Sequence, residues 1–250
     1  MTPDISIITF TLGGRPKYLI GCLDSVFNDV VADVYNEIKV EHHLVFQGEN
    51  GISEVESFLN YFNQIESYKL IIHKWPQNIG IGAGLNKIIP QCNGNLIFKM
   101  DDDCEIVSKD FFDRAISISK NYQDCVFSPQ PLGLVNNMAG PPGYSRSIFH
   151  DVEKNMYYTL RNVNHVGGFA RFAPKHIIQN FSFPNDLISG ISGTEDGDFS
   201  SYCNHYGVKM FYVETGLAVE HMEGLGQQVR YPEYFKNRPG DLNTFKRWIK

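Results

Sequence analysis

Three consecutive aspartates, Asp101-Asp102-Asp103, are the strongest chemical feature of this sequence. They directly follow an apolar run, Asn95–Met100, that is typical of a buried strand. Because side chains alternate along an extended chain, we expect Asp101 and Asp103 to point to one side and Asp102 to the other. Two carboxylates on one side suit Mg²⁺ or Mn²⁺, and such an ion can bridge to a diphosphate. An acidic turn that caps the next helix is the alternative explanation.

A second acidic group, Glu195-Asp196, begins a predicted helix, and Asp198 follows closely. Capping alone can explain this group, since a carboxylate near a helix N-terminus is stabilised as the anion. The functional hypothesis is a general base, which a transfer to a hydroxyl acceptor requires. His221 follows the predicted strand 208–213 and could complete an oxygen-rich metal site, although a lone histidine is more often structural.

The segment Asn78–Asn86 is rich in glycine. Its glycines allow the backbone to come very close to a ligand or to another strand. The segment lacks GxGxxG spacing after a first strand, and it lacks the Walker pair of Lys and Ser or Thr. These absences disfavour a Rossmann dehydrogenase and a P-loop NTPase.

The elements that must position these groups alternate between strand and helix over the first hundred residues. Strands are predicted at 5–10, 40–46, 70–72 and 95–100, with helices from Pro16, over 55–65 and before Pro90. This order predicts an α/β fold with a mostly parallel, doubly wound central sheet flanked by helices. Ligands bind such sheets beyond the carboxyl ends of the strands, which is where the three aspartates lie.

The second half of the chain is less regular. We expect a helix from Ser108, its N-cap, to Ser119, a strand over 167–172, a helix from Thr194 and a strand over 208–213. The stretch 128–147 contains several Pro and Gly residues and is predicted to be a long loop that borders the acceptor site. The chain shows no repeat and no linker, which favours one domain over residues 1–250.

The composition excludes several classes of function. A net charge of −6 without a basic tract in the first two-thirds of the chain disfavours nucleic acid as a partner. No apolar run is long enough to cross a bilayer. The five cysteines are scattered without a CxxC pair, so we predict buried free thiols and a cytoplasmic protein.

In their order and spacing, these pieces resemble the family 2 glycosyltransferases, which are inverting enzymes of GT-A fold. The resemblance covers about residues 5–221 and is carried by Arg15-Pro16 with Cys22–Ser25, Asn78-Ile79-Gly80 with Gly84–Asn86, the strand and aspartates of 94–103, Gly167-Gly168-Phe169, Glu195-Asp196, Gly207-Val208 and His221. Each motif is weak by itself, and their ordered combination is more specific.

The resemblance implies a role for each matching residue. It implies Asp196 as the base, and a Mn²⁺ or Mg²⁺ ion held by Asp101, Asp103 and His221. It implies an acceptor site at Gly167, Gly168, Phe169 and Glu195, and contacts to the nucleotide sugar from Thr9, Gln47, Asn78, Gly80, Asp101 and Asp102.

Two stretches depart from the family pattern. Leu12-Gly13-Gly14 stands where the family usually has Asn or Asp after its first strand. Phe46–Asn50 replaces an Asp-x-x-Ser segment that contacts the nucleoside, so Gln47 or Glu49 would have to substitute for it. The identity of the donor's nucleobase is therefore open, and UDP is the first choice because it is the commonest carrier of donor sugars.

The resulting hypothesis is one GT-A domain that transfers a sugar from a nucleoside diphosphate to a carbohydrate, lipid-linked or protein hydroxyl. Residues 1–103 would bind the donor and 104–230 the acceptor. In the tail, 231–250, basic and aromatic residues suit a peripheral membrane contact, but its prolines favour a tail packed on the domain. A sugar nucleotidyltransferase and a catalytically silent module of this fold are the alternatives.

Overall fold

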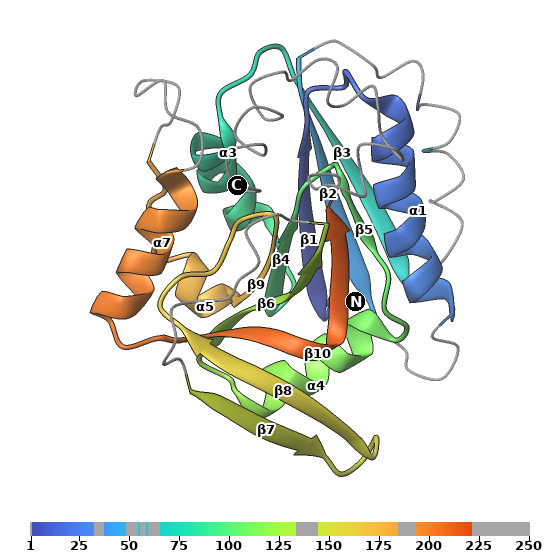
Figure 1. Ribbon diagram of the computed structural model, residues 1–250. Helices are drawn as coiled ribbons and strands as arrows, with labels where there is room; N and C mark the ends of the chain where they lie inside the picture. The colour runs from blue at the N-terminus through green and yellow to red at the C-terminus, as the bar shows by residue number, and fades with distance from the viewer. Residues whose placement is uncertain are drawn as a thin grey trace, which may run out of the picture.

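A mixed β-sheet forms the centre of the protein (Figure 1). The computed structural model describes residues 2–32, 38–48, 55, 59, 66–133, 145–184 and 194–221. Within these residues the sheet has ten strands, in the order β3-β2-β1-β4-β9-β6-β10-β8-β7, with β5 paired to β10.

The first half of the sheet is parallel. It consists of β1 (Ile5–Thr11), β2 (Val40–Gln47), β3 (Tyr68–Trp75) and β4 (Leu96–Met100). Ile5 pairs with Val40 on one side and with Leu96 on the other, so the amino ends of these strands lie level. Their carboxyl ends therefore meet at one edge of the sheet, as the sequence predicts.

The second half inserts antiparallel strands. β9 (Ala170–Pro174) runs antiparallel to both β4 and β6 (Cys125–Leu132), which restores the parallel direction in β6 and in β10 (Lys209–His221). β8 (Met156–Val163) and β7 (Arg146–Asp151) form an antiparallel hairpin at the edge, and the short β5 (Cys104–Ile106) pairs with the end of β10. The sheet as a whole is mostly parallel, which confirms the predicted fold class.

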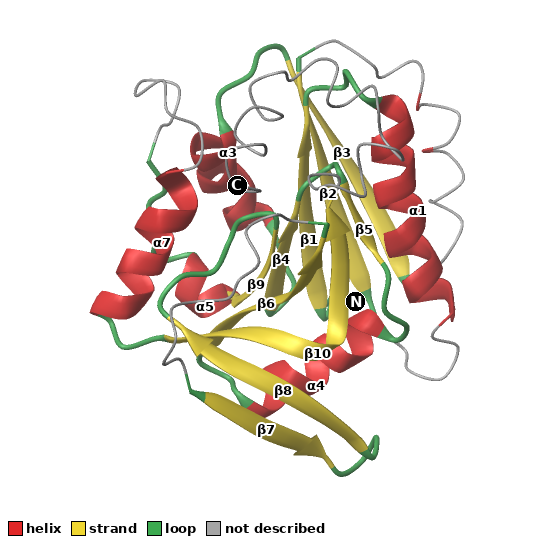
Figure 2. Cartoon of the chain, viewed as in Figure 1, coloured by secondary structure: helices red, strands yellow, loops and turns green. Residues whose placement is uncertain are grey.

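Helices cover both faces of the sheet (Figure 2). α1 (Pro16–Ala32) and α4 (Phe111–Asn121) pack on one face. α3 (Ile81–Ile88), the 3₁₀ helix η1 (Ile89–Gln91), α5 (Lys175–Ile178) and α7 (Thr194–His205) pack on the other. α1 packs on its face of the sheet through an apolar stripe at helical spacing. The buried residues of this stripe are Tyr18, Leu19, Cys22, Leu23, Val26, Phe27 and Val30.

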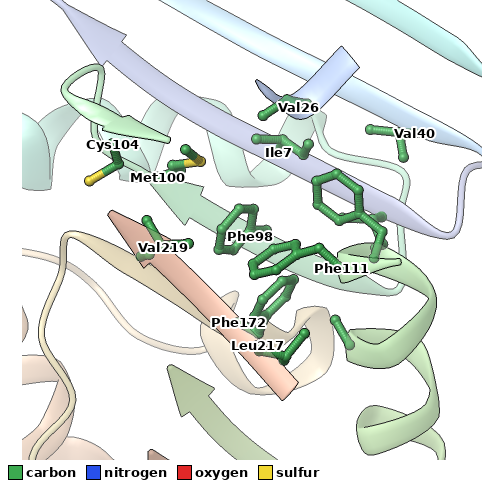
Figure 3. Packing of buried hydrophobic residues seen from close by; sticks show 14 of the residues in the cluster. Ile7, Val26, Val40, Phe98, Met100, Cys104, Phe111, Phe172, Leu217 and Val219 are labelled. Atoms are coloured by element: carbon green, nitrogen blue, oxygen red, sulfur yellow. The ribbon is translucent and has the colours of Figure 1, made fainter. Parts of the chain in front are cut away.

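Aromatic rings fill the larger core at the junction of the two halves of the sheet (Figure 3). Phe98 of β4 stacks on Phe172 of β9 with 4.1 Å between ring centroids, and Phe111 of α4 closes over both at 5.5 and 5.6 Å. Phe127 of β6 stacks on the other side of Phe172 at 4.9 Å. This packing fixes the end of β4, and therefore the position of the aspartates that follow it.

Several local predictions are confirmed. The first four strands, the helix from Pro16, the helix before Pro90 and the helix from Thr194 are all present. All five cysteines are buried and free. Of the predicted helix 55–65, the two described residues, Val55 and Leu59, are helical and buried.

Other local predictions are wrong. α4 begins at Phe111 rather than after Ser108, because both carboxylate oxygens of Asp29 accept its first N–H groups, from Phe111 at 2.9 Å and Phe112 at 3.1 Å. Ser108 instead accepts a hydrogen bond from the backbone N–H of Ala218. Residues 128–132 belong to β6, and the strand predicted at 167 begins only at Ala170.

Two further predictions concern segments that lie wholly or partly outside the described residues. These are the rest of the loop over 134–144 and the tail 231–250. None of the described helices combines the length and the apolar character needed to span a membrane.

Candidate active site

The three aspartates form a turn rather than an extended chain. β4 ends at Met100, and the N–H of Cys104 donates to the carbonyl of Asp101 at 3.3 Å. As a result, Asp102 and Asp103 face the same side, where Arg15 donates to both of them, at 2.6 and 2.8 Å. The expected alternation, with Asp102 turned away from Asp103, is therefore wrong because the chain bends immediately after the strand.

The carboxyl end of β1 supplies the partners of Asp102. Thr11, the last residue of β1, donates through its hydroxyl to Asp102 at 2.7 Å. Gly13 follows with φ of 72°, a conformation that glycine adopts without strain, and its N–H donates to Thr11 at 3.0 Å. This turn delivers Arg15 directly in front of α1. Burial raises the pKa of Asp102 to about 6, although Arg15 and Thr11 both favour its ionised form.

Asp103 also faces His221. His221 Nε2 lies 3.5 Å from Asp103 Oδ1, and both side chains are buried. The antiparallel pairing of β5 with β10 places His221 opposite Cys104, so the three side chains Asp103, Cys104 and His221 have ligand atoms within 4.8 Å of one another. A carboxylate and an imidazole suit Mn²⁺, whereas the Cys104 thiol turns to the carbonyl of Phe169 at 3.7 Å. These residues fit a divalent metal.

Asp101 has a different partner. Its carboxylate pairs with Lys99, which is almost fully buried in β4 and also donates to the carbonyl of Gly168. Burial raises the pKa of Asp101, while burial of Lys99 is outweighed by Asp101 and Asp196, so the pKa of Lys99 lies above its usual range. The structure therefore brings Asp103 and His221 together and pairs Asp101 with a lysine.

Asp196 lies in the first turn of α7 and reaches back to the sheet. Its Oδ2 accepts the N–H of Gly168 at 2.7 Å, and its Oδ1 lies 3.4 Å from Arg171 of β9. Arg171 is buried, with its guanidinium 4.5 Å from the ring centroid of Phe199. A side chain at position 168 would overlap the Asp196 carboxylate, so only glycine allows this approach.

The segment 167–169 connects the two acidic groups. Phe169 accepts the backbone N–H of Asp101 at 2.8 Å, and its ring lies edge-on to His221 with 6.2 Å between centroids. Gly167 donates to the hydroxyl of Tyr212 at 2.8 Å. Glu195, the neighbour of Asp196, is buried. The predicted acceptor residues thus lie between the aspartate turn and the predicted base.

Three of the predicted nucleotide contacts, Gln47, Asn78 and Gly80, lie farther along the edge, towards β3. Gln47, at the end of β2, accepts the N–H of Ile79 at 2.9 Å, and the exposed Asn78 accepts the N–H of Gly80 at 2.8 Å. Gly80 has φ of 84° and is the N-cap residue of α3. Thr9, in contrast, is fully buried and bonded to His42 at 3.0 Å, so its side chain is not at this edge, and Thr11 takes its place beside Asp102.

Sequence reasoning assigned no role to Arg15, Lys99 or Arg171. The sequence could have indicated Lys99 and Arg171, because each is a single charged residue within an apolar strand. A buried charge requires a partner, so each predicts a nearby carboxylate. Arg15 stands in the motif Arg15-Pro16, but only the turn after β1 shows that it faces Asp102 and Asp103.

Comparison with known proteins adds information on the fold. No family model matches the sequence, and no curated protein matches it. Among solved structures, residues 1–349 of Staphylococcus aureus TarS superpose with a TM-score of 0.63 at 16% identity over 87% of this chain. The mannosyltransferase PcManGT from Pyrobaculum calidifontis, in complex with GDP-Man and Mn²⁺, gives 0.64 at 13% identity over 88%.

A third structure, GalNAc-T7 with UDP, GalNAc and Mn²⁺, gives a TM-score of 0.63 at 11% identity over 90% of this chain. The fold is that of the GT-A glycosyltransferases. This chain covers only 60%, 57% and 45% of the three matched chains, in the order given. At these identities the comparison establishes the GT-A fold and leaves activity to be argued from the site.

Proposed function

We propose that this protein is a metal-dependent inverting glycosyltransferase that moves a sugar from a nucleoside diphosphate to a hydroxyl acceptor. The observation that carries the proposal is the pairing of Asp103 with His221 next to Asp196, since the segment 167–169 contacts both groups. Similar folds occur in structures that contain UDP-GlcNAc or GDP-Man, the latter with Mn²⁺, which supports a nucleotide-sugar donor.

In this proposal the donor lies along the carboxyl edge of the sheet. The exposed Asn78 and the backbone at Gly80 are available to the nucleotide, and Asp101 and Asp102 to its ribose or phosphates. Asp103 and His221 would hold Mn²⁺ or Mg²⁺, joined by Asp101 if it exchanges Lys99 for the cation. An ion held there would supply positive charge to offset that of the departing diphosphate.

Asp196 is the proposed base. Gly168 donates to one of its oxygens and Arg171 to the other, so the carboxylate is held in position. The Asp196 carboxylate accepts the proton of the acceptor hydroxyl while the hydroxyl oxygen bonds to the anomeric carbon of the donor sugar. The bond between that carbon and the diphosphate breaks on the opposite side. The sugar configuration is thereby inverted. UDP remains the first choice of carrier, and the acceptor is a carbohydrate, lipid-linked or protein hydroxyl.

A panel of nucleotide sugars tests this function. With Mn²⁺ present, we expect one donor to raise the melting temperature, and its slow hydrolysis to release a nucleoside diphosphate. The product of transfer should have the opposite anomeric configuration by NMR. Release of pyrophosphate from a nucleoside triphosphate would instead indicate a sugar nucleotidyltransferase, and donor binding without turnover a silent module.

A further inference from the structure

A second group of metal-ligand side chains lies at the other end of the sheet. Glu41 and His43, near the start of β2, and Cys92, which directly follows η1, present ligand atoms within 4.8 Å of one another. All three side chains are buried. We propose that Glu41, His43 and Cys92 bind a Zn²⁺ ion that is separate from the donor site and independent of the proposed transferase activity.

The backbone fixes all three residues. Glu41 and His43 are two residues apart on a strand, so they share a face of the sheet. Cys92 is held by its N–H, which donates to Ile89 at 3.2 Å, and by its carbonyl, which accepts Lys175 at 2.5 Å. Three rigid ligands therefore meet without rearrangement of the chain.

The surroundings orient each ligand. His43 Nδ1 lies 3.0 Å from His73 Nε2, while its Nε2 makes no hydrogen bond to any described residue and lies 3.4 Å from Glu41 Oε1. A proton on Nδ1, donated to His73, leaves the Nε2 lone pair for a cation, which is the usual arrangement of a metal-binding histidine. Glu41 Oε1 accepts Ser6 at 2.6 Å and the N–H of Asn93 at 2.5 Å.

The ligand types select the metal. A thiolate, an imidazole and a carboxylate together suit Zn²⁺, whereas Mg²⁺ and Ca²⁺ prefer oxygen alone. On binding, the Cys92 S–H bond breaks, its proton passes to solvent and the sulfur bonds to zinc. Three protein ligands leave a fourth position for water. A cavity of about 570 Å³ borders Glu41 and is also lined by Asn93 and Lys175.

A hydrogen-bonded network without metal is the competing explanation. It accounts for Glu41, which Ser6 and Asn93 satisfy, and for the contact of the Cys92 thiol with the carbonyl of Ile88 at 3.5 Å. It leaves the buried Nε2 of His43 without a hydrogen bond among the described residues, which is uncommon for a buried polar atom. A zinc ion satisfies that nitrogen.

Cobalt is the probe for the thiolate ligand. The full chain is stripped with a chelator and titrated with Co²⁺, and we expect a sulfur-to-cobalt charge-transfer band in the near ultraviolet that saturates at one equivalent. Cys92→Ala should lose this band, whereas the matched variant Cys104→Ala, at the other buried cysteine near a His and a carboxylate, should keep it. A wild type without the band, or a band lost only in Cys104→Ala, would overturn the proposal.

Zinc affinity supplies a second readout that does not depend on deleting a ligand. Zn²⁺ should raise the melting temperature of the wild type and of Cys104→Ala by more than that of Cys92→Ala, which keeps only the proposed metal site at Asp103 and His221. His73→Phe, which removes the partner of His43 at a partly exposed position, should weaken zinc binding roughly 10–100-fold. Equal stabilisation of Cys92→Ala, or unchanged affinity in His73→Phe with circular dichroism of the wild type, would place zinc elsewhere and refute the site.

Discussion

Each end of the central sheet carries a carboxylate, a thiol and an imidazole close together, but the surrounding charges differ between the two ends. At the carboxyl end, Asp103, Cys104 and His221 stand beside two more aspartates, and the cations Arg15 and Lys99 pair with this group. At the amino end, Glu41 is the one carboxylate of its triad, and the neutral donors Ser6 and Asn93 bond to it.

The pKa shifts differ in sign between the two ends. Burial raises the pKa of Asp101 and Asp102. Burial also acts on Glu41, but the contact with His43 Nε2 at 3.4 Å and the hydrogen bonds from Asn93 and Ser6 outweigh it and lower the pKa below the usual range. Clustered carboxylates that favour protonation are costly to the fold, and a cation relieves that cost. Burial therefore destabilises the ionised carboxylates at the carboxyl end, whereas hydrogen bonds stabilise the ionised Glu41 at the amino end.

The largest effect should come from the proposed metal ligand of the carboxyl end. Asp103→Ala is expected to reduce transfer by roughly 10³-fold or more, because a bound ion would supply several kcal/mol of charge stabilisation in the transition state. EDTA should do the same to the wild type, and both are measured as release of the nucleoside diphosphate. Asp110→Ala, whose carboxylate pairs with Arg114 at the surface, is the control and should retain activity. Full activity in EDTA would remove the metal from the mechanism.

The next effect concerns the proposed base. Asp196→Asn keeps an oxygen for Gly168 but cannot accept a proton, so transfer should fall by roughly 10²–10⁴-fold. Donor affinity with Mn²⁺, measured by calorimetry, should remain near that of the wild type. Asp198→Asn, at an exposed position two residues further along α7, is the matched control. If donor affinity falls in parallel with rate, Asp196 is structural and Glu195 becomes the candidate.

A smaller effect should follow when Asp196 is moved rather than replaced. In Gly168→Ala the new methyl group would overlap the carboxylate and displace it. A displacement of about 1 Å costs on the order of 10²-fold in rate. Gly197→Ala, where a methyl group meets nothing within 4 Å, should leave the rate unchanged. Equal rates for the two variants would show that the position of Asp196 does not matter.

The sequence predicted the parallel half of the sheet because its signals are local. An apolar β-branched run such as Ile5–Thr11, or a stripe such as that of α1, is visible within a dozen residues. The predictions that failed concern residues whose partners lie far along the chain. Ser108 is a good N-cap by type, but Asp29, about eighty positions earlier, occupies the first N–H groups of α4.

The same distinction holds at the site. The types of Asp103 and His221 suggested a metal, and the pairing of β5 with β10, which no local pattern shows, brings the two within 3.5 Å. The alternation rule failed at Asp102 because it assumes an extended chain, and the turn after β4 is set by Cys104 and by Phe169. Arg15 was missed for the same reason, since its partners lie almost ninety positions away.

The smallest expected effect is on the pH dependence of stability, and it concerns a histidine in the interior between the two ends. His42, fully buried in β2 on the opposite face from His43, contacts Tyr68 at 2.6 Å and Thr9 at 3.0 Å. Burial, with a smaller contribution from His43, lowers its pKa to about 3. Between this value and the ordinary pKa of about 6.5, the unfolded chain binds a proton that the folded protein does not. The contribution of His42 to stability is therefore complete above about pH 6.5 and is lost as the pH falls.

Urea unfolding at pH 7, 6 and 5 tests this linkage. Once the pH is below the ordinary pKa, the wild type should lose about 1 kcal/mol of unfolding free energy per pH unit because of His42, and close to 1.4 at the limit. His42→Gln keeps polar atoms at the site and does not titrate, so its free energy of unfolding should depend less steeply on pH by that amount. Parallel curves for the two proteins would mean that His42 gains a proton as easily in the fold as in the unfolded chain. The polar interior between the two ends would then tolerate charge, and the contrast in pKa shifts would be confined to the carboxylates.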